Sequence, residues 1–131
     1  MRRLVIAFAT TVPLICAAHA QNAESTSTHT FVVAKPTDVL SYNLIKLKIK
    51  NGANEEVGEI KDLVLSQNTL AGYVVSVGGF LGLGEHYVVV SPEAVKITYD
   101  ENDKRWTATM DATKDQLKAA PEFKYEGRWK R

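Results

Sequence analysis

The glycine-rich residues 78–84 have the spacing of a phosphate-binding loop. Gly79 and Gly84 are separated by four residues, as in a P-loop, whose backbone N–H groups hold nucleotide phosphates. Glu85 and His86 stand where such a loop has its lysine and its serine or threonine, and a carboxylate there repels phosphate. The flanking residues indicate a strand–loop–strand order, so the helix N-terminus that completes a phosphate site is missing. The sequence therefore argues against nucleotide binding.

Two other interpretations of this loop remain open. Its glycines permit tight turns and positive φ angles, so that two apolar side chains tuck into the fold as a plug. Alternatively, the apolar side chains form an exposed tip that inserts into a partner. The structural glycines are Gly78, Gly79, Gly82 and Gly84. The candidate binding residues are Phe80, Leu81 and Leu83.

The acidic segment near residue 100 is a poor calcium loop. Asp100, Asn102 and Asp111 fall at positions 1, 3 and 12 of an EF-hand count. Lys104 then occupies a ligand position, and Arg105 replaces the glycine that the loop needs for its sharp turn. A solvated hairpin explains the segment better.

No catalytic group can be assembled from the other candidates. His86 has no second ligand at a zinc spacing. Ser76 lacks the glycine two residues before it that marks a nucleophile elbow. Glu59 and Asp62 lie three residues apart, where pairing with Lys61 or exposure to solvent is the simpler interpretation. We expect no catalytic residue, no metal and no cofactor, and therefore no enzyme.

The C-terminal residues 126–131 form a basic and aromatic tail. Together with Lys124 and Tyr125 they carry four cations and two aromatic side chains. Such a segment is suited to rest on an anionic surface of lipid or protein, which makes Arg128 and Trp129 candidate binding residues. A solvated chain end is the alternative.

Residues 1–20 have the order of a secretory signal peptide. Arg2 and Arg3 form a cationic start, residues 4–18 are almost entirely apolar, and Ala18-His19-Ala20 supplies small residues at the cleavage positions. The apolar run is shorter than the roughly 20 residues that span a bilayer. We expect cleavage after Ala20 and export to the bacterial periplasm or beyond.

The exported chain has a length that suits a single domain, and it contains no cysteine. Removal of the signal leaves 111 residues with 14 Lys and Arg against 15 Asp and Glu, a net charge of −1. That balance does not suit a basic nucleic-acid binder. The only cysteine, Cys16, leaves with the signal, which excludes a disulfide, a thiol nucleophile and a cysteine-ligated metal.

The hydrophobic pattern predicts β-structure beyond a polar, flexible leader at residues 21–37. Within the leader, residues 31–33 are apolar and either add a strand or cover a groove. Ile45, Leu47 and Ile49 then alternate with lysines, as in a half-buried strand whose charged outer face discourages edge-to-edge aggregation.

Five further strands and one helix follow. The expected strands are residues 56–66, 70–77, 87–90, 95–99 and 106–110. The spacing changes after Gly58, which predicts a β-bulge or a sharp coil in the first of them. Thr113 and Gln116 have the spacing of a capping box, and Pro121 ends the short helix that they begin. The sequence predicts a small, mostly β barrel or sandwich with a short C-terminal helix.

Four segments in order resemble the PRC-barrel domain family. Leu44-Ile45 through Asn51, then residues 55–60 and Asp62, resemble its opening pattern L-I-G-K-x-V-Y-N-x-x-G-E-x-V-G-x-I-x-D. Residues 74–83 resemble its third strand and glycine loop, and residues 88–92 its V-x-V-P segment. Residues 117–123 are similar to the tail of exported members.

The resemblance covers about residues 38–125 and departs from the pattern in the first hairpin. Lys46-Leu47 replaces the family's Gly-Lys, Lys50 replaces its tyrosine, and Asn54 replaces its turn glycine. The resemblance implies a six-stranded barrel that docks on partners. That is the role of the family in the cytoplasmic domain of the photosynthetic reaction-centre H subunit and in the C-terminal domain of a ribosome maturation factor.

Two functions fit these observations. The first is a non-catalytic protein-interaction or structural module of the periplasm with an unidentified protein partner. The second is a binder of a small apolar ligand or lipid, through the glycine-rich loop or the barrel mouth. A cavity larger than roughly 300 Å³ beside Phe80 favours the second, and a flat surface with exposed Phe80 and Trp129 favours the first. The sequence leaves the oligomeric state open.

Overall fold

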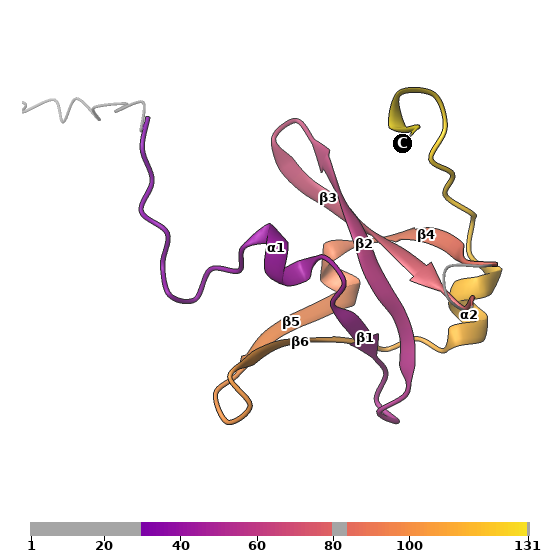
Figure 1. Ribbon diagram of the computed structural model, residues 1–131, viewed down its shortest axis with the longest axis horizontal. Helices are drawn as coiled ribbons and strands as arrows, with labels where there is room; N and C mark the ends of the chain where they lie inside the picture. The colour runs from indigo at the N-terminus through magenta and orange to yellow at the C-terminus, as the bar shows by residue number, and fades with distance from the viewer. Residues whose placement is uncertain (1–29, 80–83, 131) are drawn as a thin grey trace, which may run out of the picture. The chain divides into compact units, whose positions relative to one another are not determined.

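Six β-strands form one mixed sheet in the computed structural model, which describes residues 30–79 and 84–130. The strands are β1 (Lys48–Lys50), β2 (Glu56–Ser66), β3 (Thr69–Val77), β4 (His86–Val90), β5 (Val95–Asp100) and β6 (Arg105–Met110). Their order in the sheet is β4-β3-β2-β1-β6-β5, and only the β1–β6 pair is parallel. In Figure 1, β2 and β3 form the long hairpin drawn in magenta.

The mostly β fold with six strands and a C-terminal helix is confirmed. Closure of the sheet into a barrel is not, because β4 and β5 end the strand order and no ladder joins them within the part of the chain that the structure describes. The two edge strands are connected by a single 3₁₀ turn, Pro92–Ala94. None of the helices among the described residues is long and apolar enough to cross a membrane.

The chain divides into two compact units, residues 1–34 and residues 35–131. The expected signal peptide lies outside the described residues. Phe31, Val32 and Val33 are exposed and form no strand. The second unit begins with a turn in which Asp38 N donates to Lys35 O over 2.9 Å.

The first strand is shorter than the alternating pattern predicts. A helical turn, α1 (Ser41–Leu44), precedes it, and the β-ladder begins only at Lys48 because Lys46 adopts a φ of 71°. The backbone at Lys46 is nevertheless tied to β2, since its N–H donates to Ile60 O over 2.8 Å. The apolar face survives this irregularity, with Ile49 fully buried and Ile45 and Leu47 packed against the core.

The β2–β3 hairpin carries the predicted bulge. The register shifts between Ile60 and Asp62, so Lys61 has no partner in β3. Gln67 and Asn68 connect the two strands, and both have positive φ, which is the backbone of the tight turns that match the twist of paired strands.

The core is built from β-branched side chains on the inner face of the sheet. Its fully buried members are Ile49, Val57, Ile60, Val75, Val77 and Val88. Each of these contributes roughly 1.5–3 kcal/mol through burial of apolar area. Gly58 permits the close approach of β3, because a Cβ at this position would lie 2.5 Å from Val75 Cγ1 and 2.9 Å from Ser76 O.

Helix α2 (Lys114–Ala119) begins at the predicted capping box. Thr113 Oγ1 accepts from Gln116 N at 3.1 Å, and Thr113 N donates to Gln116 Oε1 at 2.8 Å. These bonds satisfy N–H groups that the first helical turn would otherwise leave unpaired. Leu117 is buried and joins the core, so the helix packs on β2, β3 and β4 (Figure 1).

Candidate functional site

The residues after α2 run along the edge strand β4. Phe123 N donates to Tyr87 O over 2.7 Å, and His86 Nε2 lies 3.3 Å from Ala120 O. From here on, the tail means residues 121–130, which include most of the basic and aromatic residues 126–131 described above. Its attachment continues as ring contacts, because the centroids of Tyr87 and Tyr125 lie 5.5 Å apart in an edge-to-face arrangement.

Contacts between aromatic rings hold the remaining part of the tail in place. Phe123 contacts Tyr125 with a centroid distance of 5.0 Å and Trp129 with a distance of 5.6 Å. Gly127 begins a 3₁₀ turn, η2 (Gly127–Trp129), at a positive φ of 59°, and this turn folds Trp129 back towards Phe123. The tail therefore packs in a defined way on the fold.

A cavity of about 340 Å³ lies between the tail and the outer side of the β2–β4 region. We call it the tail groove; it is lined by Asp62, Leu63, Val64, Leu65, Val74, Val89, Phe123, Tyr125 and Trp129. Its walls are mostly apolar, with Asp62 as a charged member of the lining. Its rim is open to solvent, since Trp129 is 63% exposed, Leu65 68% and Val89 44%. The arrangement suits the contact of an apolar group from outside.

Of the two candidate binding residues in the tail, the structure brings only Trp129 to this groove. Arg128 is exposed in the same 3₁₀ turn and does not line the cavity. No local pattern in the sequence indicates the other walls, because the rings of Phe123 and Tyr125 reach the sheet only after the tail turns back along β4.

The acidic residues beside β4 form an ion network with a lysine and a tyrosine. Lys61 Nζ lies 2.8 Å from Glu59 Oε1 and 3.5 Å from Glu85 Oε1, and Tyr87 OH donates to Glu85 Oε2 at 2.6 Å. The hydrogen bond that Lys61 donates to Glu59 raises the pKa of Lys61, and the bond that Tyr87 donates to Glu85 raises the pKa of Tyr87. The predicted pairing of Glu59 with Lys61 is confirmed.

Three glycines of the glycine-rich loop lie within the described residues. Gly78, Gly79 and Gly84 have φ angles of 73°, 81° and 69°. A small cavity of about 190 Å³ adjoins Gly78 and Gly79, and its lining is polar, with Glu59 and Glu85 among it. The rest of the loop, Phe80, Leu81, Gly82 and Leu83, lies outside the described residues, so its role as a plug or an exposed tip stays a prediction.

A larger cavity, of about 520 Å³, opens where β1 and β6 diverge. We call it the lysine groove; it is lined by Lys46, Leu47, Lys48, Lys50, Asn51, Asn54, Arg105, Trp106, Thr107, Ala108 and Thr109. The sequence places the lysines on one face but indicates nothing of a groove. Its second wall comes from β6, which is far along the chain and is joined to β1 by a parallel ladder.

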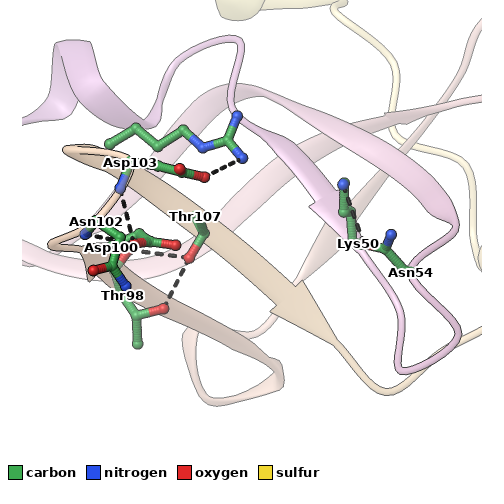
Figure 2. Close-up of polar contacts among 8 residues, drawn as sticks. Lys50, Asn54, Thr98, Asp100, Asn102, Asp103 and Thr107 are labelled. Atoms are coloured by element: carbon green, nitrogen blue, oxygen red, sulfur yellow. Dashed lines mark hydrogen bonds and ion pairs between the residues drawn. The ribbon is translucent and has the colours of Figure 1, made fainter.

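Polar contacts hold the β5–β6 hairpin, whose strand β6 also lines this groove (Figure 2). Asp100 Oδ1 accepts from the backbone N–H groups of Asn102 and Asp103 at 2.9 and 3.1 Å, and the hydroxyl groups of Thr98 and Thr107 lie 2.9 Å apart. These bonds give the acidic segment the hairpin role that the sequence indicates. Within the described residues, no group of three or more His, Cys, Asp or Glu side chains is placed to hold a metal ion.

Comparison with known families gives a match to the PRC-barrel domain. The model of the PRC-barrel domain matches residues 36–117, which is more than half of the chain. The match includes all six strands and both walls of the lysine groove, and it ends before the tail begins. No curated protein matches the chain.

Proposed function

The chain belongs to the PRC-barrel domain family, and from that premise we propose that it is a non-catalytic module that binds another protein in the bacterial periplasm. A PRC-barrel domain fits a small module without a catalytic site of its own. Support for the absence of catalysis comes from the two carboxylates beside the glycine-rich loop: Glu59 and Glu85 are engaged with Lys61 and Tyr87.

The proposed location rests on the order of residues 1–20, which is that of a cleaved signal peptide. The mass of the protein recovered from the periplasmic fraction tests it. We expect a chain that begins at Gln21. Recovery of a chain that still carries residues 1–20, or of all the protein from the cytoplasm, would contradict export and cleavage.

The tail groove is the observation that carries the proposal. Three exposed apolar side chains line this cavity: the indole of Trp129 and the aliphatic side chains of Leu65 and Val89. Each such side chain contributes roughly 1.5–3 kcal/mol when a partner covers it. Exposed aromatic residues that are held in place by their neighbours are typical anchors of protein interfaces, and Phe123 holds Trp129 in this way.

Affinity capture from periplasmic extract tests the partner surface. The comparison uses the unaltered protein, Trp129→Ala and the control Tyr42→Ala, which removes an aromatic side chain that is 72% exposed and does not line the tail groove. We expect a specific protein to be captured by the unaltered protein and by the control, and to be largely lost with Trp129→Ala. Equal recovery with all three would remove the tail groove as the contact surface.

A small apolar ligand or lipid is the second candidate, and the same cavity favours it. Its volume of about 340 Å³ lies at the lower end of the range of small-molecule sites, roughly 300–1,000 Å³. The cavity beside Gly78 and Gly79 is smaller and polar, so the tail groove is the better site for such a ligand. Native mass spectrometry of protein purified from periplasm separates the candidates: a bound small molecule that is lost with Trp129→Ala favours the ligand, and bare protein that still captures its partner favours the interaction module.

A further inference from the structure

The lysine groove carries positive charge that the protein itself does not neutralise. Four cationic side chains line it, and no carboxylate does within the described residues. Lys48 is paired with Glu56 at 2.8 Å and Arg105 with Asp103 at 2.9 Å. Lys46 and Lys50 form no ion pair with any described residue.

The neutral part of the lining completes a binding surface. Lys50 Nζ donates to Asn54 Oδ1 at 3.1 Å, which holds its ammonium group beside the groove (Figure 2). Trp106 is half-buried and contacts Tyr99 with a centroid distance of 5.3 Å, so its indole forms a fixed apolar wall. The groove therefore presents cations beside an apolar, aromatic surface.

Lys46 is held there in spite of its backbone. Its φ of 71° costs a residue with a side chain roughly 1–2 kcal/mol, and the family pattern noted above has a glycine at this position. A strained backbone conformation that persists beside a cavity is a reason to look for function at that residue. Here the strained residue is one of the two groove lysines that lack an ion pair.

We propose that the lysine groove binds an extended acidic peptide segment of a partner protein. Successive lysines on one face of β1 are two residues apart, which is about 6.6 Å along a strand. Carboxylates at alternate positions of an extended peptide repeat at the same distance, so they match Lys48 and Lys50, and Lys46 supplies a further cation in the lining of the groove. The side chains between them lie towards Trp106.

This inference rests on the proposed function only in treating the chain as a protein-binding module. It concerns a different surface, because the lysine groove and the tail groove share no residue. A purified peptide as the probe keeps the two separable: loss of partner capture with Trp129→Ala leaves peptide binding unchanged, and failure of peptide binding leaves the tail groove untouched.

Peptide titration followed by tryptophan emission is the test. The chain has two tryptophans, so a Trp129→Phe background leaves Trp106, at the groove, as the only reporter. The probe is a synthetic peptide in which Glu alternates with Ser, and the control peptide has the same composition with all its Glu residues in one block. Variants Lys46→Gly and Lys50→Gln are compared with Lys96→Gln, which removes the same charge from an exposed site outside the groove.

We expect the alternating peptide to bind more tightly than the block peptide. Lys46→Gly and Lys50→Gln should each weaken binding by about twofold to fivefold, the range for exposed ion pairs, and raised salt should weaken it further. Lys96→Gln should leave it unchanged. Equal weakening by all three variants, or equal affinity for the two peptides, would show that binding depends only on net charge and would overturn the proposed match between lysines and alternate carboxylates. Binding to phosphatidylglycerol vesicles with the same lysine dependence but not to either peptide would overturn the proposal in favour of a lipid surface.

Discussion

Replacement of Lys46 by glycine and by alanine tests the backbone at the lysine groove. Both variants remove the ammonium group, so the difference between them reports on the backbone alone. Lys48 is the matched control, because it is also an exposed lysine of the same segment and does not have positive φ. Its ion pair with Glu56 is lost equally in Lys48→Gly and Lys48→Ala.

The two positions should respond with opposite signs. In an ordinary strand, glycine is less stable than alanine by roughly 0.5–1 kcal/mol because it loses more backbone entropy on folding. At a φ of 71°, alanine keeps a strain of roughly 1–2 kcal/mol that glycine lacks. The difference leaves Lys46→Gly more stable than Lys46→Ala by about 0.5–1 kcal/mol, and Lys48→Gly less stable than Lys48→Ala by a similar amount.

Urea unfolding of the chain from Gln21 measures this difference. With a slope of about 2 kcal/mol per M, the expected shift of the midpoint is roughly 0.25–0.5 M in each direction. The hydrogen bond from Lys46 N to Ile60 O holds the backbone in place, so relaxation of φ in the alanine variant is not expected to remove the effect. A Lys46→Ala variant as stable as or more stable than Lys46→Gly would refute the strained conformation.

Three further perturbations follow from the core, the helix cap and the ion network. Gly58→Ala should lower the free energy of unfolding by about 1–3 kcal/mol because its Cβ meets side-chain and backbone atoms of β3, whereas Gly52→Ala, with open space around it, should change it little; urea unfolding of the pair compares them. Thr113→Ala should cost about 1 kcal/mol and reduce helical circular dichroism, through loss of the capping box. The raised pKa of Tyr87 means that the folded chain holds the phenol proton more tightly than the unfolded chain. The stabilisation from this group is therefore complete below pH about 10 and is lost as the pH rises through the folded pKa. Tyr87→Phe should make that alkaline decline of the free energy of unfolding shallower, and an unchanged decline would contradict the hydrogen bond to Glu85.

Local patterns were enough to predict most of the fold. Strand β2 lies at the predicted residues 56–66, and the change in spacing after Gly58 does mark a bulge, at Lys61. The capping box of Thr113 and Gln116 forms as predicted, because such a motif depends only on residues that are close in sequence. Strand alternation and helix capping both depend on residues that are close in sequence, so they can be recognised from the sequence alone.

The first hairpin shows what a two-residue period cannot predict. The alternation of lysines suggests an unbroken strand from Ile45, but Lys46 and Asn54 have positive φ, and these are two of the positions where the family pattern has glycine. The departures from the pattern therefore mark the places where the backbone is unusual. The alternation of apolar and charged residues does not indicate a positive φ, because it depends on side-chain type and not on the backbone angle.

Both grooves were missed because each is formed by segments that are distant in the chain. The tail groove needs Phe123 and Tyr125 on the outer side of the β2–β4 region, and the lysine groove needs β6 beside β1. Trp129 was identified from its chemistry as an exposed aromatic residue among cations. Its neighbours in the groove have no such local signal.

Photo-crosslinking in living cells tests the central claim, that the chain is an interaction module which uses the tail groove. A photoreactive phenylalanine derivative replaces Trp129, and the matched control carries it at Glu101, an exposed residue of the β5–β6 turn. We predict a discrete, larger adduct with one protein in the periplasmic fraction from position 129 and none of that size from position 101. Illumination that yields the same adducts from both positions, or none from position 129, would contradict the account.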